Sequence, residues 1–136
     1  MIHTAEEFAR LRRSDVPAEY QRAASEEAPV DVWLSVIDQF PDLREWVAHN
    51  KTVPLPVLEL LARDPSASVR FTVASKRKLS HELQILLVTD PDSSVRHGLA
   101  RNAKCEPEVL QRLAEDSESF VREVASKRLS VRGDSL

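Results

Sequence analysis

The chain has little of what sheets, disulfide frameworks and phosphate-binding loops need. Its 136 residues include two glycines, one cysteine and few aromatic side chains, which make up 5% of the total. Two glycines cannot build a glycine-rich phosphate loop, and one cysteine cannot form an internal disulfide bond. No run approaches the roughly 18 apolar residues of a membrane span, and residues 1–7 lack the basic and apolar segments of a signal peptide. We therefore expect a cytoplasmic protein with no membrane partner.

The charge of the chain is nearly balanced overall but unevenly distributed. The formal net charge is −3. Residues 1–48 carry ten acidic and five basic side chains, whereas residues 49–136 carry twelve acidic and fourteen basic ones. This asymmetry predicts a polarised surface whose basic side belongs to the C-terminal two-thirds.

A fixed period runs through most of the chain and is clearest in four Asp–Arg pairs, each with a separation of six. The pairs are Asp38 and Arg44, Asp64 and Arg70, Asp90 and Arg96, and Asp116 and Arg122, so each pair follows the one before by the same interval. Such a period is typical of a repeat array. We expect each Asp to accept backbone N–H bonds at a turn. We expect each Arg to reach a turn carboxylate of its own unit or of the next unit, so that the pairs form a structural ladder.

Apolar residues recur with the same period and predict two short helices in each unit. The predicted core columns include Leu43, Val69, Val95 and Val121; Val47, Val73, Leu99 and Ala125; and Leu34, Leu60 and Leu86. The first helices are expected to start at Pro56, Glu82 and Glu108. The second helices are expected to start near Ser68, Ser94 and Ser119, where a hydroxyl can cap them, and to end near Lys76, Asn102 and Arg128. Helices this short need packing against neighbouring units.

Two segments carry a nameable pattern, Leu61 to Arg70 (LARDPSASVR) and Leu87 to Arg96 (LVTDPDSSVR). They resemble the variant leucine-rich repeat, a family similar to HEAT repeats in its packing and its Asp–Arg ladder. The resemblance covers about residues 29–129 and departs from the pattern at Gln39 and Ser117, where the other units have proline. It implies an all-α, right-handed α-solenoid of about four 26-residue, two-helix repeats. The expected repeats are 29–54, 55–80, 81–106 and 107–129.

The two ends of the chain fall outside the repeat register. Thr4 and Glu7 predict a capping-box start for a helix through Arg13. Residues 14–17 should open a second helix that continues to about Ser25. Their expected apolar face consists of Phe8, Leu11, Val16 and Tyr20. Residues 1–28 are therefore predicted to form an N-terminal helical cap, and residues 130–136 a flexible tail, with one domain overall.

Catalytic and metal-binding patterns are not evident in the sequence. The four histidines share no metal-ligand spacing, and the only His–Glu dipeptide is His81–Glu82. Cys105 falls in the column of Val53 and Leu79, which predicts a buried apolar role. The sequence therefore predicts a protein that is not an enzyme and that has no catalytic residue, metal site or cofactor.

The surface of the second helices is more informative than the core. Trp46, Phe71 and His97 are aromatic residues at non-core positions, which favours contact with a protein partner. Basic residues gather at the helix ends in windows without an acid. The predicted partner-binding residues are Trp46, His49, Phe71, Lys76, Arg77, Lys78, His97, Arg101, Lys104 and Lys127. The helix dipole also favours cations at these ends, so a purely structural reason for them stays open.

These observations favour a non-catalytic protein-interaction module that presents a concave face and a basic ridge to an acidic protein partner. An immunity protein or an antitoxin is one instance of such a small binder. One alternative is a nucleic-acid-binding protein of the HEAT-like, DNA-repair kind, although the net negative charge opposes it. Another is a structural subunit that forms a homo-oligomer. The sequence does not select an oligomeric state.

Overall fold

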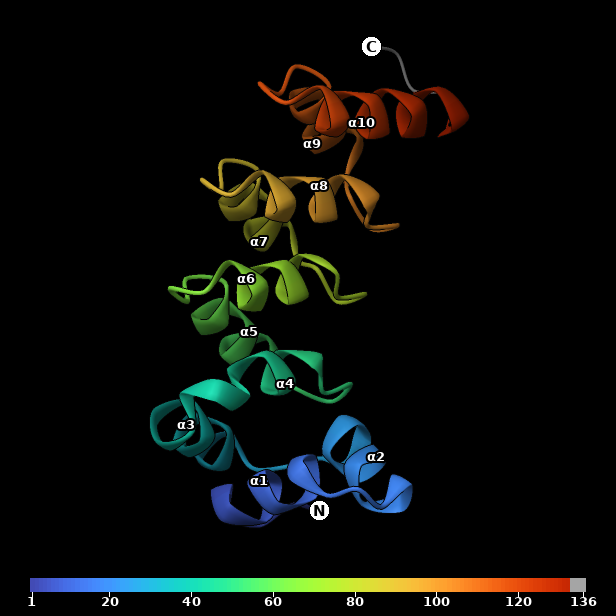
Figure 1. Ribbon diagram of the computed structural model, residues 1–136. Coiled ribbons are helices and arrows are strands. Elements are labelled where there is room, and N and C mark those ends of the chain that lie inside the picture. Colours follow the sequence, from blue (N-terminus) through green and yellow to red (C-terminus); the bar gives the residue numbers. More distant parts are fainter. Residues whose placement is uncertain (133–136) are drawn as a thin grey trace. The chain divides into compact units, whose positions relative to one another are not determined.

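The structure is a computed structural model that describes residues 1–132. Within these residues the chain folds into ten α-helices and one short 3-10 helix, with no strand (Figure 1). The all-α class predicted from the sequence is therefore confirmed. No helix in this described part is long and apolar enough to cross a lipid bilayer.

The contacts between residues divide the chain into two compact units, unit 1 (Met1–Arg63) and unit 2 (Asp64–Leu136). Unit 1 contains α1 (Ala5–Arg13), α2 (Pro17–Ser25), α3 (Val30–Gln39), η1 (Pro41–Leu43), α4 (Arg44–His49) and α5 (Leu55–Leu61). Unit 2 contains α6 (Ala67–Ala74), α7 (His81–Leu87), α8 (Ser93–Arg101), α9 (Pro107–Leu113) and α10 (Ser119–Arg132). The boundary falls inside the predicted repeat 55–80, and the predicted cap shares unit 1 with the first predicted repeat.

Unit 1 is organised around the packing of α1 on α2 and α3. The hydroxyl of Thr4 accepts the backbone N–H of Glu7 at 3.0 Å, which confirms the predicted start of α1. Phe8 and Trp33 are fully buried and meet edge to face, with ring centroids 5.2 Å apart. The predicted apolar face was half wrong, because Val16 and Tyr20 are exposed. Both belong to a helix start whose other side packs through Ala23.

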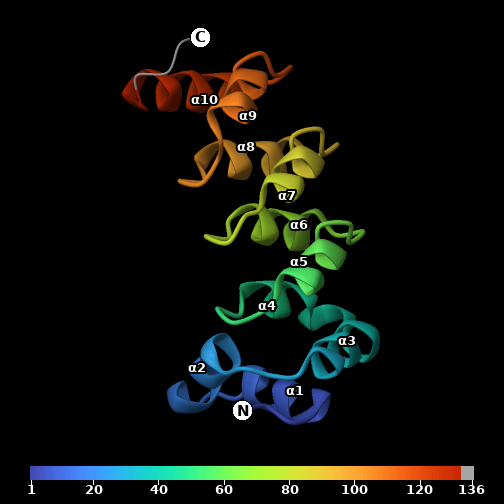
Figure 2. The same ribbon diagram turned by 180° about the vertical axis from the view of Figure 1, so that it is seen from behind.

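In unit 2 alternate helices begin at a constant interval, the period of the sequence. The helices α6, α8 and α10 begin at Ala67, Ser93 and Ser119, each one period after the one before. The helices α7 and α9, which begin at His81 and Pro107, are also one period apart. The helix α8 packs against both α6 and α10, and Figures 1 and 2 show α7 and α9 beside this row.

The capping of the second helices differs from the prediction in one respect. Ser68 and Ser94 lie inside α6 and α8, and Ser66 and Asp92 occupy the N-cap positions. The carboxylate of Asp92 accepts the backbone N–H of Ser94 at 2.8 Å. At the other end of the unit, α10 continues through Arg132 rather than ending near Arg128. The predicted flexible tail is therefore wrong for residues 130–132, and residues 133–136 lie outside the described part.

Most predicted core columns are buried. Leu43, Val69, Val95 and Val121 are buried, and so are Val47, Val73, Leu99 and Ala125. Cys105 is fully buried as well, in the column of Val53 and Leu79. The column of Leu34, Leu60 and Leu86 was wrong, since Leu34 and Leu60 are exposed and Leu86 is only half-buried.

In unit 2, Arg–Asp pairs connect α6 to the turn before α8, and α8 to the turn before α10. The guanidinium of Arg70 donates two bonds to the carboxylate of Asp90, with Nε 2.8 Å from Oδ2. Arg96 does the same to Asp116, with Nε 2.8 Å from Oδ1. Both arginines are largely buried, and each also donates from Nη1 to the backbone carbonyl of the Asp six residues before it. Each arginine therefore binds the aspartate of the next predicted repeat rather than that of its own repeat, and both ion pairs are bidentate.

The aspartates of the ladder also hold their own turns. Asp64, Asp90 and Asp116 each accept the backbone N–H two residues later, at 2.9–3.0 Å. Burial raises the pKa of Asp116, but the bonds from Arg96 and from the N–H of Glu118 outweigh burial and lower that pKa overall. The turn at Asp116 forms although serine follows it instead of proline.

The first and last members of the predicted ladder differ from the middle ones. Asp38 is exposed inside α3 and forms no turn, because that helix continues through Gln39 where a proline follows Asp64 and Asp90. Arg44 donates from Nε to the carbonyl of Ile37 at 2.8 Å, so this bond reaches the backbone of α3 rather than the carboxylate of Asp38. Arg122 is exposed and bonds the carbonyl of Asp116 at 2.8 Å.

A second periodic contact was not predicted. Asn50 and Asn102 follow α4 and α8 and are buried. The amide of Asn50 donates to the carbonyls of Ala23 and Glu26, 2.8 and 3.1 Å away. The amide of Asn102 donates to the carbonyls of Ala74 and Lys76, 2.7 and 2.8 Å away. We call this arrangement the asparagine clamp, because one side chain satisfies two carbonyls at the C-terminal end of another helix.

Candidate partner-binding site

Four of the predicted partner-binding residues line one hollow in unit 2. Phe71 comes from α6, Arg77 follows that helix, Arg101 is the last residue of α8, and Lys104 lies in the loop after it. The hollow has a volume of about 680 Å³, and no acidic side chain is among the residues described as lining it. We call it the basic hollow, lined by Phe71, Ser75, Arg77, Gly98, Arg101 and Lys104.

The floor of the basic hollow is made by a ring lying on a glycine. A Cβ atom on Gly98 would stand 2.8 Å from Cε2 of Phe71, closer than side-chain carbons approach. Only the absence of a side chain at Gly98 lets the ring of Phe71 rest on α8. The ring is 40% exposed in this position. The hollow therefore offers a fixed aromatic surface to whatever enters it.

Three cations line the basic hollow together with the ring of Phe71. Arg77, Arg101 and Lys104 are all exposed. The helix dipole accounts for cations near the C-terminal ends of α6 and α8. It does not account for an exposed aromatic ring in the same hollow, and this combination suits a ligand with both negative charge and apolar surface.

The remaining predicted basic residues are not among those that line the hollow. Lys78 and Lys127 are exposed elsewhere in unit 2. Lys76 is half-buried, and burial together with the nearby charge of Lys78 lowers its pKa to about 8. Lys76 lies one period after Asn50 and one period before Asn102. It therefore occupies the repeat position that the asparagines of the clamp occupy in the neighbouring repeats. Its prediction as a surface contact is therefore weakened by its burial.

His97 lies on α8 beside a residue that the sequence analysis missed. The rings of His97 and Phe120 meet edge to face with centroids 5.3 Å apart. Phe120 belongs to α10 and is 41% exposed. A signal for it was present, because Phe120 is an aromatic residue outside the core columns of a second helix, as Phe71 is.

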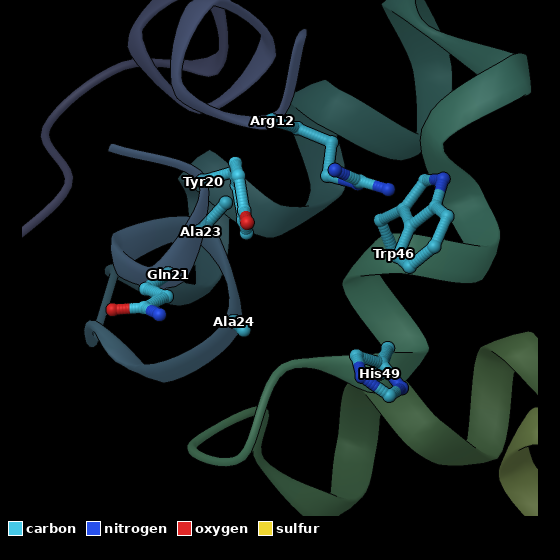
Figure 3. A pocket seen from close by; sticks show the side chains of 7 residues that line it. All are labelled: Arg12, Tyr20, Gln21, Ala23, Ala24, Trp46 and His49. Carbon is cyan, nitrogen blue, oxygen red and sulfur yellow. The ribbon is translucent and has the colours of Figure 1, made fainter. Parts of the chain in front are cut away.

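Trp46 and His49 lie in unit 1 and line a different, smaller pocket. This aromatic pocket has a volume of about 280 Å³ and is also lined by Arg12, Tyr20, Ala23 and Ala24. The guanidinium carbon of Arg12 lies 3.5 Å from the centroid of the Trp46 ring, a cation–π contact that Figure 3 shows between α1 and α4. Trp46 thus covers the N-terminal helices while its other edge faces the pocket.

The polar groups that line the basic hollow are the cations of Arg77, Arg101 and Lys104, the hydroxyl of Ser75 and the amide of Asn102. Cations beside an apolar ring suit the binding of an anionic group. Comparison of the chain with protein-family models, with curated proteins and with solved structures found no match.

Proposed function

We propose that the protein is a non-catalytic interaction module that binds an acidic segment of a protein partner in the basic hollow of unit 2. The observation that carries this proposal is that Arg77, Arg101 and Lys104 line the same hollow as the exposed ring of Phe71. An aromatic anchor with cations in the same hollow favours an acidic segment that also presents an apolar side chain. An immunity protein or antitoxin would be one instance of such a binder.

The proposal includes a repeat architecture, a right-handed α-solenoid like that of variant leucine-rich repeats. The constant interval between helix starts supports it, as does the pairing of arginine with the aspartate 20 residues later. Small-angle scattering tests it. A stacked array should have a radius of gyration above the roughly 14 Å of a compact chain of this length. A value at or below that would exclude the array.

Charge reversal in the basic hollow tests the binding proposal. The variant Arg77→Glu with Arg101→Glu should weaken capture of a partner by about thirtyfold, since two of the three cations that line the hollow are replaced by repulsive charges. The matched control is Arg112→Glu, which reverses one exposed cation of α9 outside the hollow. A partner with an acidic surface that is retained by the control and lost by the double variant supports the proposal.

A second arm tests the floor of the hollow without changing charge. Gly98→Ala would displace the ring of Phe71, so binding should fall while the helix itself gains propensity. Phe71→Ala should weaken binding by about 2 kcal/mol if the ring is the anchor. Equal binding by wild type, Gly98→Ala and Phe71→Ala would overturn this role of the hollow.

Nucleic acid is the alternative that the same cations favour. Duplex DNA bound through phosphates would lose affinity steeply as salt rises, and Arg77→Glu with Arg101→Glu would reduce the salt dependence. Phe71→Ala would then matter little, because duplex phosphates do not contact an apolar floor. Binding of duplex DNA that is insensitive to Phe71→Ala, with no acidic protein captured, would replace the proposed function by this one.

A further inference from the structure

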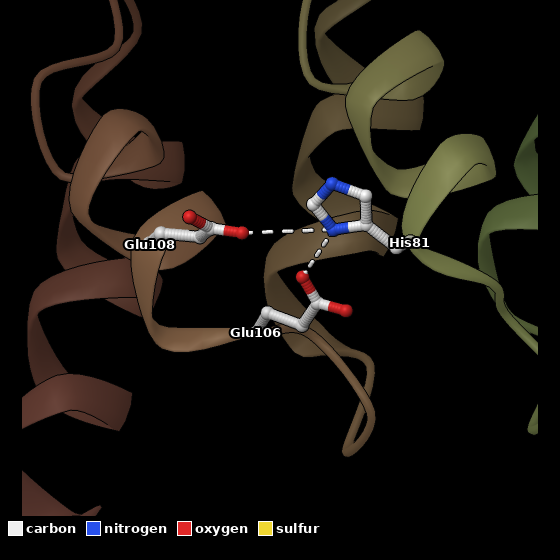
Figure 4. A group of neighbouring side chains, drawn as sticks. All are labelled: His81, Glu106 and Glu108. Carbon is white, nitrogen blue, oxygen red and sulfur yellow. Dashed lines mark hydrogen bonds and ion pairs between the residues drawn. The ribbon is translucent and has the colours of Figure 1, made fainter.

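A histidine and two glutamates meet at the starts of two successive helices in unit 2. His81 is the first residue of α7, Glu106 is the N-cap residue of α9, and Glu108 lies in the first turn of α9. The Nδ1 atom of His81 lies 2.6 Å from Oε1 of Glu106 and 3.5 Å from Oε1 of Glu108 (Figure 4). One ligand atom from each residue falls within 4.8 Å of the others.

The backbone that carries these three side chains is fixed by a buried glutamine. Gln84 lies one turn after His81 on α7 and is 1% exposed. Its Nε2 donates to the carbonyl of Lys104 at 3.0 Å, and its Oε1 accepts the N–H of Glu106 at 2.8 Å. The start of α9 is thereby tied to α7. His81 and the two glutamates are consequently held in register rather than brought together by chance contact of long side chains.

The distances from His81 to the two glutamates are close to those around a small divalent cation. Two ligands at about 2.0–2.2 Å from a tetrahedral zinc ion stand roughly 3.3–3.5 Å apart. The 3.5 Å between His81 Nδ1 and Glu108 Oε1 already has this value. The 2.6 Å between His81 Nδ1 and Glu106 Oε1 must open by less than an ångström. The carboxylate of Glu106 is only half-buried and can turn that far.

We propose that His81, Glu106 and Glu108 form a binding site for Zn²⁺. One imidazole and two carboxylates supply nitrogen and oxygen ligands of the kind that zinc accepts, and neutralise the charge of the ion. His81 and Glu108 are exposed, so the fourth position is open to water or to a side chain of a partner. This site is independent of the basic hollow and does not rest on the proposed function.

A proton competes with the metal for the same nitrogen. The hydrogen bond to Glu106, with the negative charges of Glu106 and Glu108, raises the pKa of His81. Zinc must displace this proton from Nδ1, since only a neutral imidazole nitrogen can bind a metal.

Calorimetric titration of the full chain with Zn²⁺ tests the site. His81→Ala, Glu106→Gln and Glu108→Gln should each weaken binding by about tenfold or more. The matched control is Glu82→Gln, which removes the same charge from the neighbouring residue of α7 that is not in the cluster. Zinc affinity unchanged by His81→Ala, or lowered as much by Glu82→Gln as by Glu106→Gln, would overturn the proposal.

Nuclear magnetic resonance of the histidine rings gives a second readout that does not depend on affinity. Addition of one equivalent of Zn²⁺ should shift the ring signals of His81 and leave those of His3, His49 and His97 in place. Equal shifts at all four histidines would mean adventitious binding and would refute the site.

Discussion

The two units are both built from short helices, but different contacts hold them. In unit 1, aromatic rings occupy the centre: Phe8 meets Trp33 edge to face, and Arg12 lies on Trp46. In unit 2, the successive helices are joined by the bidentate pairs of Arg70 with Asp90 and of Arg96 with Asp116. The comparison shows that short helices with the same periodic leucines and valines can be held together either by an aromatic cluster or by repeated ion pairs.

The units also share one device, the asparagine clamp. Asn50 serves unit 1 and Asn102 serves unit 2, and each is followed by a backbone N–H that its own Oδ1 accepts, from Thr52 and Lys104. The clamp therefore occurs in both units, whereas the packing of Phe8 on Trp33 is described in unit 1 and the bidentate pairs of Arg70 and Arg96 are described in unit 2. Four predictions test this division.

The largest effect is expected from the aromatic centre of unit 1. Trp33→Ala should lower the free energy of unfolding by about 3–5 kcal/mol, because it removes a fully buried ring and leaves a cavity. Urea denaturation followed by circular dichroism measures it. Leu34→Ala, on the same helix but exposed, should cost less than about 1 kcal/mol. Equal costs for the two variants would contradict the central role of Trp33.

The ladder of unit 2 should be the next most sensitive feature. Arg96→Ala should cost about 3 kcal/mol, because it leaves the largely buried carboxylate of Asp116 without its bidentate partner. Arg122→Ala should cost about 1 kcal/mol or less, since that arginine is exposed and donates to a neutral carbonyl. Urea denaturation of both variants measures these losses of stability. A loss for Arg122→Ala as large as that for Arg96→Ala would contradict the difference.

The asparagine clamp should affect both units alike. Asn50→Ala and Asn102→Ala should each cost about 2 kcal/mol, because each removes a side-chain amide that donates to two carbonyls at a helix end. Gln21→Ala, which removes an exposed amide, is the control. Clearly unequal losses of stability for the two asparagines would show that the clamp is not a shared device.

The smallest effect, of opposite sign in the two units, is expected from pH. In unit 1 the hydrogen bond from Arg22 is the main cause that lowers the pKa of Glu26 to about 2, so its contribution is present above the unfolded pKa and is lost as pH falls toward 2. In unit 2 the pKa of His81 is raised by Glu106, so its contribution is present below the unfolded pKa and is lost as pH rises through the folded one. Nuclear magnetic resonance titration of both side chains checks the two directions.

The sequence predicted the core columns well because one period governs them. The buried columns that begin with Leu43 and Val47 were correct in both units. The predicted burial of Leu34, Leu60 and Leu86 was wrong, because the spacing shows which residues share a face of a helix but not which face packs against the core. The turn predicted at Asp38 was wrong, because the helix α3 continues through this residue.

The candidate sites could be predicted only where their residues follow the period. Phe71, Arg77, Arg101 and Lys104 lie on adjacent predicted repeats. The sequence predicted a ridge of basic residues at the helix ends, but not that these four residues line one hollow. The contact of Arg12 with Trp46 was not foreseeable, because it depends on where α1 packs outside the register. The cluster of His81 with Glu106 was missed because its members are 25 residues apart and neither repeats.

The forward direction of the ladder has a consequence for how such a chain can change in length. Every bidentate pair described joins an arginine to the aspartate 20 residues later. Deleting residues 81–106 would place Arg70 at that same distance before Asp116, so the remaining arginine and aspartate would suit each other. Insertion of a duplicated block one period long would leave every old pairing distance intact and add one new pair. Duplication or loss of a whole block one period long therefore preserves the spacing of the Arg–Asp pairs in unit 2. An insertion of a few residues between Arg70 and Asp90 does not preserve it.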